Sequence, residues 1–293
     1  MRIVVAGSTG FIGSALVPEL ARAGHQVRRL VRREPTADNE FTWDPPAGTI
    51  DDTALDGVDA VVNLCGSSLI GRWSAAHKQA IRDSRIEPTE VLAEAVARTG
   101  VPALLNASGI GFYGDTGDVT VDEQAGQGAG FIAEVVGDWE AATAPAAAAG
   151  ARVVLMRNGL VLSTDGGLLR ILKPVFWLGL GARLGEGRQF MPWISHPDAI
   201  AAIRFLIEHA EVSGPVNMCS PHPVTNREFT HTFGKALGRP APWFAPKAAL
   251  RLALSDAADE MLLAGQHAIP RKLTDAGFEF RHPHLDTALA DVV

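Results

Sequence analysis

A glycine motif near the amino terminus constrains the fold more than any other feature of this sequence. Gly7, Gly10 and Gly13 form GSTGFIG directly after the apolar run 3–6 and at the start of a segment with helical periodicity. Between a strand and a helix, these glycines permit a tight turn, close backbone approach to a pyrophosphate, and packing of the helix on the strand. The helix N-terminus also offers free N–H groups to phosphates. The motif predicts a dinucleotide-binding loop with cofactor contacts from Gly7, Thr9, Gly10, Phe11, Ile12 and Gly13.

Apolar strand-like runs then alternate with helix-length segments over the first 160 residues. Strands are expected at 3–6, 27–31, 59–64, 101–107 and 152–156, with a polar loop after the second. Helices are expected at 11–23, within 74–98 as one or two segments, and at 131–144. Fully apolar strands joined by helices indicate a parallel sheet covered on both faces. The sequence therefore predicts an α/β protein with a Rossmann-type doubly wound parallel sheet.

The local composition of the sequence changes after about residue 160, where Gly and Pro become frequent. We expect a Rossmann domain over 1–165, with a possible return to the sheet within 190–218. A smaller C-terminal substrate lobe is expected over 166–293, with a terminal motif at 242–293. Helical pieces are expected there at 198–209, 247–254 and 259–265.

Composition excludes several classes of protein. The chain has 293 residues, 47% of them apolar, and a net charge of −7 without a basic tract, which is typical of a globular protein and argues against a nucleic-acid partner. No uninterrupted apolar stretch is long enough to span a membrane, so no membrane partner is expected. Cys65 and Cys219 lie far apart without metal-ligand spacing, and the histidines are scattered. We therefore expect no metal site and a reducing, cytoplasmic environment.

The end of the second strand predicts which dinucleotide binds. An NAD-specific site has an acidic residue there to accept from the ribose 2′-hydroxyl, whereas this strand ends at Val31 and is followed by Arg32 and Arg33. A guanidinium can instead donate two hydrogen bonds to a 2′-phosphate. We expect NADP(H) as the cofactor, with Arg32, next to Val31, in contact with its 2′-phosphate. Arg33 is a possible second contact. The alternative is that both arginines are simply solvated.

A second group of cofactor contacts is expected after the strand at 59–64. Small residues there would let adenosine and ribose lie over the sheet edge, which assigns contacts to Leu64, Cys65 and Gly66. Cys65 is expected to be a packing residue and not a nucleophile, because no histidine or metal partner is evident.

Several motifs together resemble one enzyme superfamily. They are GSTGFIG, NLCG at 63–66, SGIGFYG at 108–114, RWSAAHKQAIRDSR at 72–85, DWEAA at 138–142, LGEGRQFMPWISHPD at 184–198, GPVNMCSPHPVTNREF at 214–229 and GQHAIPRKLTDAGFEF at 265–280. The chain resembles the extended short-chain dehydrogenase/reductases of the NAD-dependent epimerase/dehydratase group. Within it, the chain is similar to the atypical sugar nucleotide epimerase-like, or cell-division-inhibitor-like, branch with a small C-terminal domain. The resemblance covers the whole chain.

The resemblance implies a catalytic Ser, Tyr and Lys in a YxxxK pattern, which this sequence lacks. Tyr113 is the only tyrosine, and Gly117 stands four residues after it. By alignment of the motifs, the YxxxK tyrosine would fall near 131 or 132 and its lysine near 135 or 136, all apolar. The serine position is nearly kept as Ser108, although a strict ungapped match selects Gly109.

Other residues would therefore have to replace the missing YxxxK pair. We predict Ser108 as a hydrogen-bond donor, Tyr113 as a proton donor and His196 near the rim of the site, with Glu123 or Glu140 as possible bases. Each has a structural alternative, such as packing or helix capping. The resemblance also makes Arg85, Asn158 and Val161 cofactor contacts, and proposes substrate contacts from Arg72, Trp73, Arg188, Gln189 and Trp193.

Two functions follow as alternatives. One is an NADP(H)-dependent oxidoreductase or epimerase-like enzyme acting on an unidentified small molecule, for which a sugar-nucleotide-like compound is one candidate. The other is a non-catalytic NADPH-binding sensor or regulatory protein. By analogy with extended relatives, the chain is expected to be a monomer or a homodimer.

Overall fold

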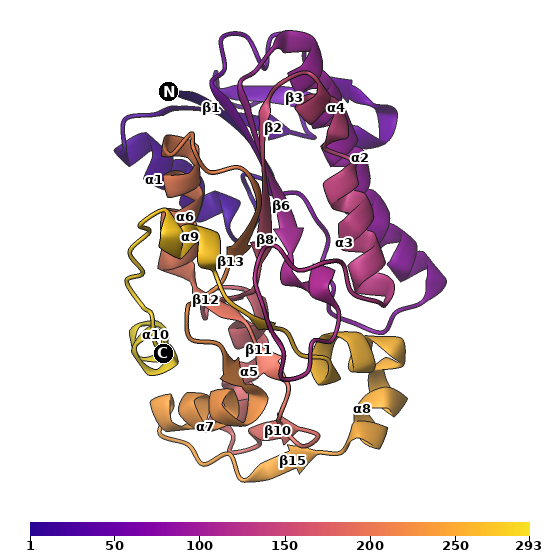
Figure 1. Ribbon diagram of the computed structural model, residues 1–293, viewed down its shortest axis with the longest axis vertical. Helices are drawn as coiled ribbons and strands as arrows, with labels where there is room; N and C mark the ends of the chain where they lie inside the picture. The colour runs from indigo at the N-terminus through magenta and orange to yellow at the C-terminus, as the bar shows by residue number, and fades with distance from the viewer.

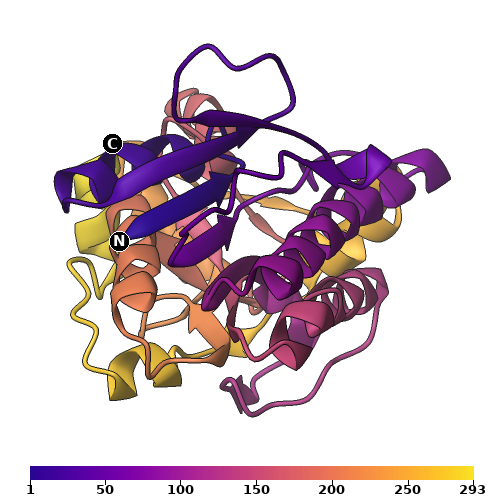
Figure 2. The ribbon, with the colours of Figure 1, turned by 90° about the horizontal axis from the view of Figure 1, so that it is seen from above.

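A computed structural model describes all 293 residues and is built around one large sheet. The sheet has eight strands, and seven of them run parallel, while β4 pairs antiparallel to β3 at one edge (Figures 1 and 2). In spatial order the strands are β13 (Gly214–Met218), β8 (Arg152–Asn158), β6 (Ala103–Gly109), β5 (Ala60–Asn63), β1 (Arg2–Ala6), β2 (Gln26–Val31), β3 (Glu40–Asp44) and β4 (Thr49–Ile50). The reversal of strand order beside β1 confirms the predicted doubly wound α/β class.

Alternation of side chains along β1 explains the three layers. Ile3 and Val5 are fully buried on one face of the sheet, while Val4 is fully buried on the other. A strand buried on both faces needs helices on both faces. The face of Ile3 is covered by α1 (Gly13–Arg22), α6 (His196–Glu208) and α9 (Arg271–Asp275). The opposite face is covered by α2 (Ala75–Thr99), with α3 (Phe131–Ala141) and α4 (Ala144–Ala148) beside it.

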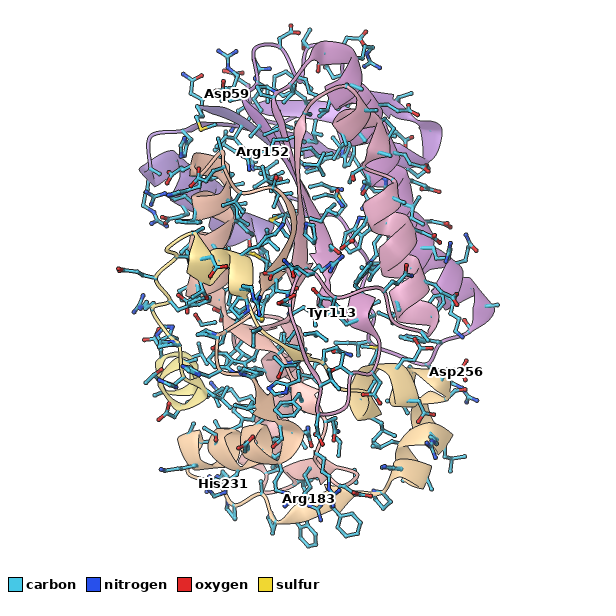
Figure 3. The ribbon with its side chains drawn as sticks, viewed as in Figure 1. Asp59, Tyr113, Arg152, Arg183, His231 and Asp256 are labelled. Carbon is cyan, nitrogen blue, oxygen red and sulfur yellow. The ribbon has the colours of Figure 1, made fainter.

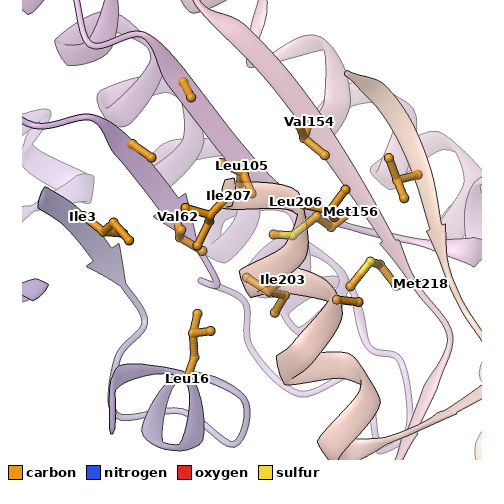
Figure 4. Close-up of a cluster of buried hydrophobic side chains, with 14 of the residues drawn as sticks. Ile3, Leu16, Val62, Leu105, Val154, Met156, Ile203, Leu206, Ile207 and Met218 are labelled. Atoms are coloured by element: carbon orange, nitrogen blue, oxygen red, sulfur yellow. The ribbon is translucent and has the colours of Figure 1, made fainter. Parts of the chain in front are cut away.

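The core on the first face joins segments from distant parts of the chain. Figure 4 shows Leu16 of α1 and Ile203 and Leu206 of α6 directed toward the strands, where Val62 and Met156 lie. These side chains are almost completely buried, which fixes α1 and α6 against the central strands.

The remaining elements form a second body below the carboxyl ends of the central strands (Figure 1). Its core holds Trp193, Phe229, Phe233 and Leu289. The helices are α5 (Gly167–Trp177), α7 (Asn226–Ala236), α8 (Lys247–Leu254), a π-helical turn (Ala258–Leu263) and α10 (Leu285–Val292). The strands are β7 (Thr120–Val121), β9 (Leu160–Leu162), β10 (Ala182–Leu184), β11 (Phe190–Met191), β12 (Trp193–Ser195), β14 (Val224–Thr225), β15 (Trp243–Ala245) and β16 (His267–Ala268). Short 3₁₀ turns cover Pro45–Ala47 and Ile110–Tyr113.

The main difference from the sequence prediction lies after β2. The expected polar loop contains β3 and β4, which extend the sheet. The polar residues of this segment predict a loop, but Glu40 and Trp43 of β3 are both buried. Two arginines neutralise the Glu40 carboxylate, which allows a charged residue to sit inside the edge of the sheet.

Other boundaries differ by a few residues. The segment 74–98 forms one helix although it contains Pro88, and the helix expected at 131–144 ends at Ala141 before a separate short helix. Within the range 190–218, β13 pairs in parallel with β8 and completes the sheet. None of the helices combines the length and the apolar character that crossing a lipid bilayer requires.

Candidate functional site

The glycine loop packs tightly between β1 and α1 at the carboxyl edge of the sheet. Gly7 has a φ of +77°, and a Cβ at this position would lie 2.8 Å from the carbonyl oxygen of Leu64. A Cβ on Gly13 would lie 2.2 Å from the carbonyl oxygen of Gly7. Side chains are excluded at both positions, so the loop stays close to the strand end, and the first turn of α1 lies beside it.

A cavity of about 580 Å³ opens beside this loop. Eight of the predicted cofactor residues line it: Gly7, Thr9, Gly10, Val31, Arg32, Leu64, Cys65 and Gly66. The cavity thus joins three segments that the sequence assigned separately to one ligand. The other six predicted contacts, Phe11, Ile12, Gly13, Arg85, Asn158 and Val161, lie outside its lining.

The lining of the cavity fits a dinucleotide. The Ser8 hydroxyl is buried at the cavity wall and has no hydrogen-bond partner in the protein. Buried hydroxyls are rarely left unpaired, so a polar ligand group is the expected partner. A cradle too narrow for any Cβ at Gly7, followed by a helix N-terminus, is also what a pyrophosphate requires.

Arg32 and Arg33 have different surroundings although they are neighbours. Arg33 donates to both carboxylate oxygens of Glu40, at 2.8 and 2.7 Å, and Glu40 also pairs with Arg29. Arg32 is exposed, lines the cavity, and has neither an ion pair nor a hydrogen bond within the protein. Arg32 is therefore the guanidinium left free for a ligand, while Arg33 holds the loop.

One part of the cavity wall was not predicted from the sequence. Trp43, Pro45 and Pro46 line the cavity from β3 and the 3₁₀ turn that follows it. They supply a flat apolar surface of the kind that an adenine ring packs against. The WDPP sequence is the local signal for this wall, whereas the polar residues around it predict a loop. Further residues that line the cavity unpredicted are Ser8, Leu30, Ser67, Ser84, Glu87 and Pro88.

Arg85 lies behind the cavity wall. Its guanidinium donates to the carbonyl oxygens of Ile81 and Ser67, each at 3.0 Å, and stacks over Trp139 with 5.3 Å from its carbon to the ring centre. Burial without a carboxylate partner lowers the pKa of Arg85 to about 10. The contacts of Arg85 hold the segment at Gly66 and Ser67, which lines the cavity.

Ser108 belongs to a buried polar network at the ends of β6 and β8. Its hydroxyl donates to Glu140 Oε1 at 2.6 Å. Glu140 also accepts two hydrogen bonds of 2.8 Å from Arg157, one from Nε and one from Nη2. Both charged side chains are less than a tenth exposed. Glu140 is thus a buried partner of an arginine and not a free base.

Tyr113 belongs to the same network. Figure 3 shows its side chain at the centre of the molecule, and it is 4% exposed. The hydroxyl donates to Asn217 Oδ1 at 2.8 Å and accepts from Arg157 Nη1 at 2.9 Å. Burial raises the pKa of Tyr113, although Arg157 opposes the shift. The backbone N–H of Asn217 in turn donates to the buried carboxylate of Glu123, whose pKa is raised by burial.

His196 lies away from that network. Its ring stacks on Phe11 of the glycine motif with 4.8 Å between ring centres, and Nε2 is 3.4 Å from the Phe11 carbonyl oxygen. His196 is the first residue of α6, where Ser195 caps the helix by accepting from the N–H of Asp198. The histidine is thus next to the predicted cofactor loop and not capping its own helix.

The positions expected for the YxxxK pair are packed as apolar residues. Val135 and Val136 are buried in α3. At the start of this helix, Glu260 accepts from the backbone N–H groups of Phe131 and Ile132, at 3.1 and 2.8 Å. A carboxylate from the C-terminal part of the chain therefore caps the helix that carries these positions.

Asn158 and Val161 follow the end of β8. The Asn158 amide nitrogen donates to the carbonyl oxygens of Ser108 and Met156, at 3.3 and 3.1 Å, while its Oδ1 is buried without a partner. Val161 pairs with Ile194 in a short parallel ladder of β9 and β12. The Asn158 Oδ1 is thus an unused hydrogen-bond acceptor close to Ser108.

A second cavity, of about 320 Å³, lies between the start of α3 and the C-terminal part of the chain. Gly111, Gly114 and Ile132 line it on one side, and Lys247 and Glu260 on the other. Of the predicted substrate contacts, Arg72, Trp73, Arg188, Gln189 and Trp193, none lines this cavity.

The fold and the glycine-loop cavity define a Rossmann-type dinucleotide-binding protein. The chain belongs to the NAD dependent epimerase/dehydratase family, whose profile matches residues 3–219, and residues 245–292 match a domain of unknown function, DUF1731. These matches confirm the predicted superfamily and its branch with a small C-terminal domain.

Individual relatives cover the whole chain. An epimerase family protein of Mycobacterium bovis is 54% identical over 98% of this chain and 96% of its own length. The crystal structure of human epimerase family protein SDR39U1 with NADPH has a TM-score of 0.89 at 33% identity, covering 100% of this chain and 99% of that one. A nucleoside-diphosphate sugar epimerase from Corynebacterium glutamicum has a TM-score of 0.82 at 36% identity, covering 100% of this chain and 58% of that one.

Proposed function

We propose that this protein binds NADPH in the 580 Å³ cavity, with the ribose 2′-phosphate on Arg32. The observation that carries the proposal is the contrast between two adjacent arginines. Arg33 forms an ion pair with Glu40, whereas Arg32 has no ion pair within the protein. The same pairing neutralises the only buried carboxylate of β3, which would otherwise repel a phosphate. The human relative whose crystal structure contains NADPH supports this choice of cofactor.

The experiment compares NADPH and NADH affinity by calorimetry. Arg32→Ala should weaken NADPH binding by about tenfold to a hundredfold, since charge-assisted hydrogen bonds contribute about 1.5–3 kcal/mol, and should leave NADH almost unchanged. Arg33→Ala is the matched control and should preserve the preference for NADPH. Wild-type protein that binds NADH as tightly as NADPH would contradict the proposal.

We further propose that the protein acts as an oxidoreductase or epimerase-like enzyme on a small polar molecule, with sugar nucleotides as the first class to test. NADPH, when bound, supplies a hydride. The chain itself would bind and orient the reactants and hold a proton. Ser108 and Tyr113 already donate their hydroxyl protons to protein groups, whereas His196 lies outside that network beside Phe11. The ring of His196 makes one long polar contact, from Nε2 to the Phe11 carbonyl oxygen at 3.4 Å, and we assign it the role of moving a proton.

A second candidate function is a non-catalytic NADPH sensor. The buried network of Ser108, Glu140, Arg157 and Tyr113 favours it, because this network satisfies its own hydrogen bonds and offers no free acid. NADPH oxidation against a panel of carbonyl compounds and sugar nucleotides separates the two. Turnover by the wild type that is lost in His196→Gln supports an enzymatic function. Tight NADPH binding without oxidation of NADPH by any compound of the panel supports a sensor function.

A further inference from the structure

The C-terminal lobe carries large apolar side chains on its outer surface. Trp177, Leu178, Leu180, Trp243 and Phe244 are each 58–69% exposed. They come from the end of α5, from the turn that follows it, and from β15, which pairs with β10. The Trp243 indole donates to the Gly179 carbonyl oxygen at 2.9 Å, which brings the two segments together. Contiguous exposed apolar surface of this kind marks an interaction site.

The two chain segments that carry these side chains contain basic residues and no acidic ones. Residues 167–184 and 235–254 contain seven of the 26 Lys and Arg residues and none of the 33 Asp and Glu residues, in a chain of net charge −7. Among the seven cations, Arg251 alone forms an ion pair, with Asp259. Arg239 and Arg183 lie over exposed aromatic rings, 5.0 Å from the centre of Trp177 and 5.5 Å from that of Phe244.

The surface lies at the far end of the molecule from the amino terminus. Figure 1 places β10 and β15 at this end, and Figure 3 shows Arg183 there. We call the five apolar residues, with Arg170, Lys173, Arg183 and Arg239, the basic apolar patch. The cofactor cavity is lined by none of these residues, so both surfaces can be occupied at once.

We propose that the basic apolar patch binds the surface of an anionic lipid bilayer. Exposed Trp, Phe and Leu side chains insert at the boundary of headgroups and acyl chains, and surrounding Lys and Arg attract anionic headgroups. Both requirements are met at one end of a protein whose remaining surface is acidic. A second copy of the chain fits the patch poorly, because its own patch would bring like charges together. The proposal concerns adsorption to the surface only, and it departs from the sequence-based expectation of no membrane partner.

The test is co-sedimentation of the full chain with vesicles. Binding is expected to vesicles of phosphatidylcholine mixed with phosphatidylglycerol, not to phosphatidylcholine alone, and to weaken with added salt. Arg170→Glu should reduce binding by at least about fivefold, the equivalent of one lost surface cation. Arg98→Glu is the matched control, since Arg98 is an exposed helical residue outside the patch, and should bind like the wild type.

The apolar part of the patch has its own control. Leu178 and Val119 are similarly exposed, at 69% and 67%, but Val119 lies outside the patch. Leu178→Ser should reduce vesicle binding by about tenfold and Val119→Ser should not. Equal loss in patch and control variants overturns the proposal. The proposal is also overturned if the wild-type protein fails to bind anionic vesicles at low salt and instead dimerises, or binds an acidic protein, through Leu178.

Discussion

Glu140 and Arg157 form a doubly hydrogen-bonded ion pair between α3 and the end of β8, with 2.8 Å from Nε to Oε1 and from Nη2 to Oε2. The pair joins Ser108 on one side to Tyr113 on the other. Both side chains are desolvated, so their attraction is weakly screened, but removing either charge leaves the other buried and unpaired. The pair therefore ties the helix to the sheet at the edge where Ser108 and Tyr113 lie.

Glu140→Gln is expected to destabilise the protein by about 3–5 kcal/mol, because Arg157 would remain charged in a buried site. Asp138→Asn is the matched control on the same helix. Asp138 pairs with Arg82 at the surface, where loss of an ion pair costs about 0–1 kcal/mol. Urea unfolding followed by circular dichroism measures both values. Equal shifts for the two variants would show that the buried pair contributes no more than a surface pair.

The Glu40 carboxylate predicts a pH dependence of stability. Hydrogen bonds from Arg33, and then from the Thr36 backbone, lower the pKa of Glu40 from 4.5 to about 2. A lowered pKa in the folded state means that the stabilisation is fully present above about pH 4.5 and is lost as the pH falls toward 2. Urea midpoints across this window should fall less steeply in Glu40→Gln than in the wild type. Glu34→Gln, at an exposed site without an arginine partner, should keep the wild-type slope.

Cys65 is expected to be unreactive although it lines the cofactor cavity. Burial raises the pKa of its thiol to about 12, with Arg32 opposing the shift, so the thiolate is scarce at neutral pH. Native protein should react slowly with a disulfide reagent and more slowly still with NADPH bound. Cys65→Ser isolates Cys219, which is fully buried and should react only after unfolding. Rapid labelling of Cys65 at neutral pH would contradict the assignment of a packing role.

Local patterns predicted the glycine loop, because a strand, three glycines and a helix are adjacent in the chain. Arg32 follows from its place after β2 for the same reason. By contrast, Tyr113 and Asn217 meet although 104 residues separate them. Their contact depends on how β13 returns to the sheet, and no local pattern specifies such a pairing. Trp43 was missed because a buried, neutralised Glu40 made its strand look like a polar loop.

Tyr113 offers a direct test of the network because it is the only tyrosine in the chain. Burial raises its pKa above 10, so absorbance of tyrosinate should develop at a higher pH in folded than in unfolded protein. The stabilisation linked to this group is present below pH 10 and is lost as the pH rises through the folded-state pKa.

Tyr113→Phe leaves Asn217 Oδ1 and Arg157 Nη1 without their buried partner, which should cost about 1–3 kcal/mol. If Tyr113 only completes this network, NADPH affinity and any measured turnover should be preserved once the variant is folded. Turnover that disappears while the unfolding free energy drops by no more than this amount would instead support the predicted role of Tyr113 as a proton donor. The pH profile of the remaining activity separates the cases, because loss of a proton donor removes its alkaline limb whereas weaker packing does not.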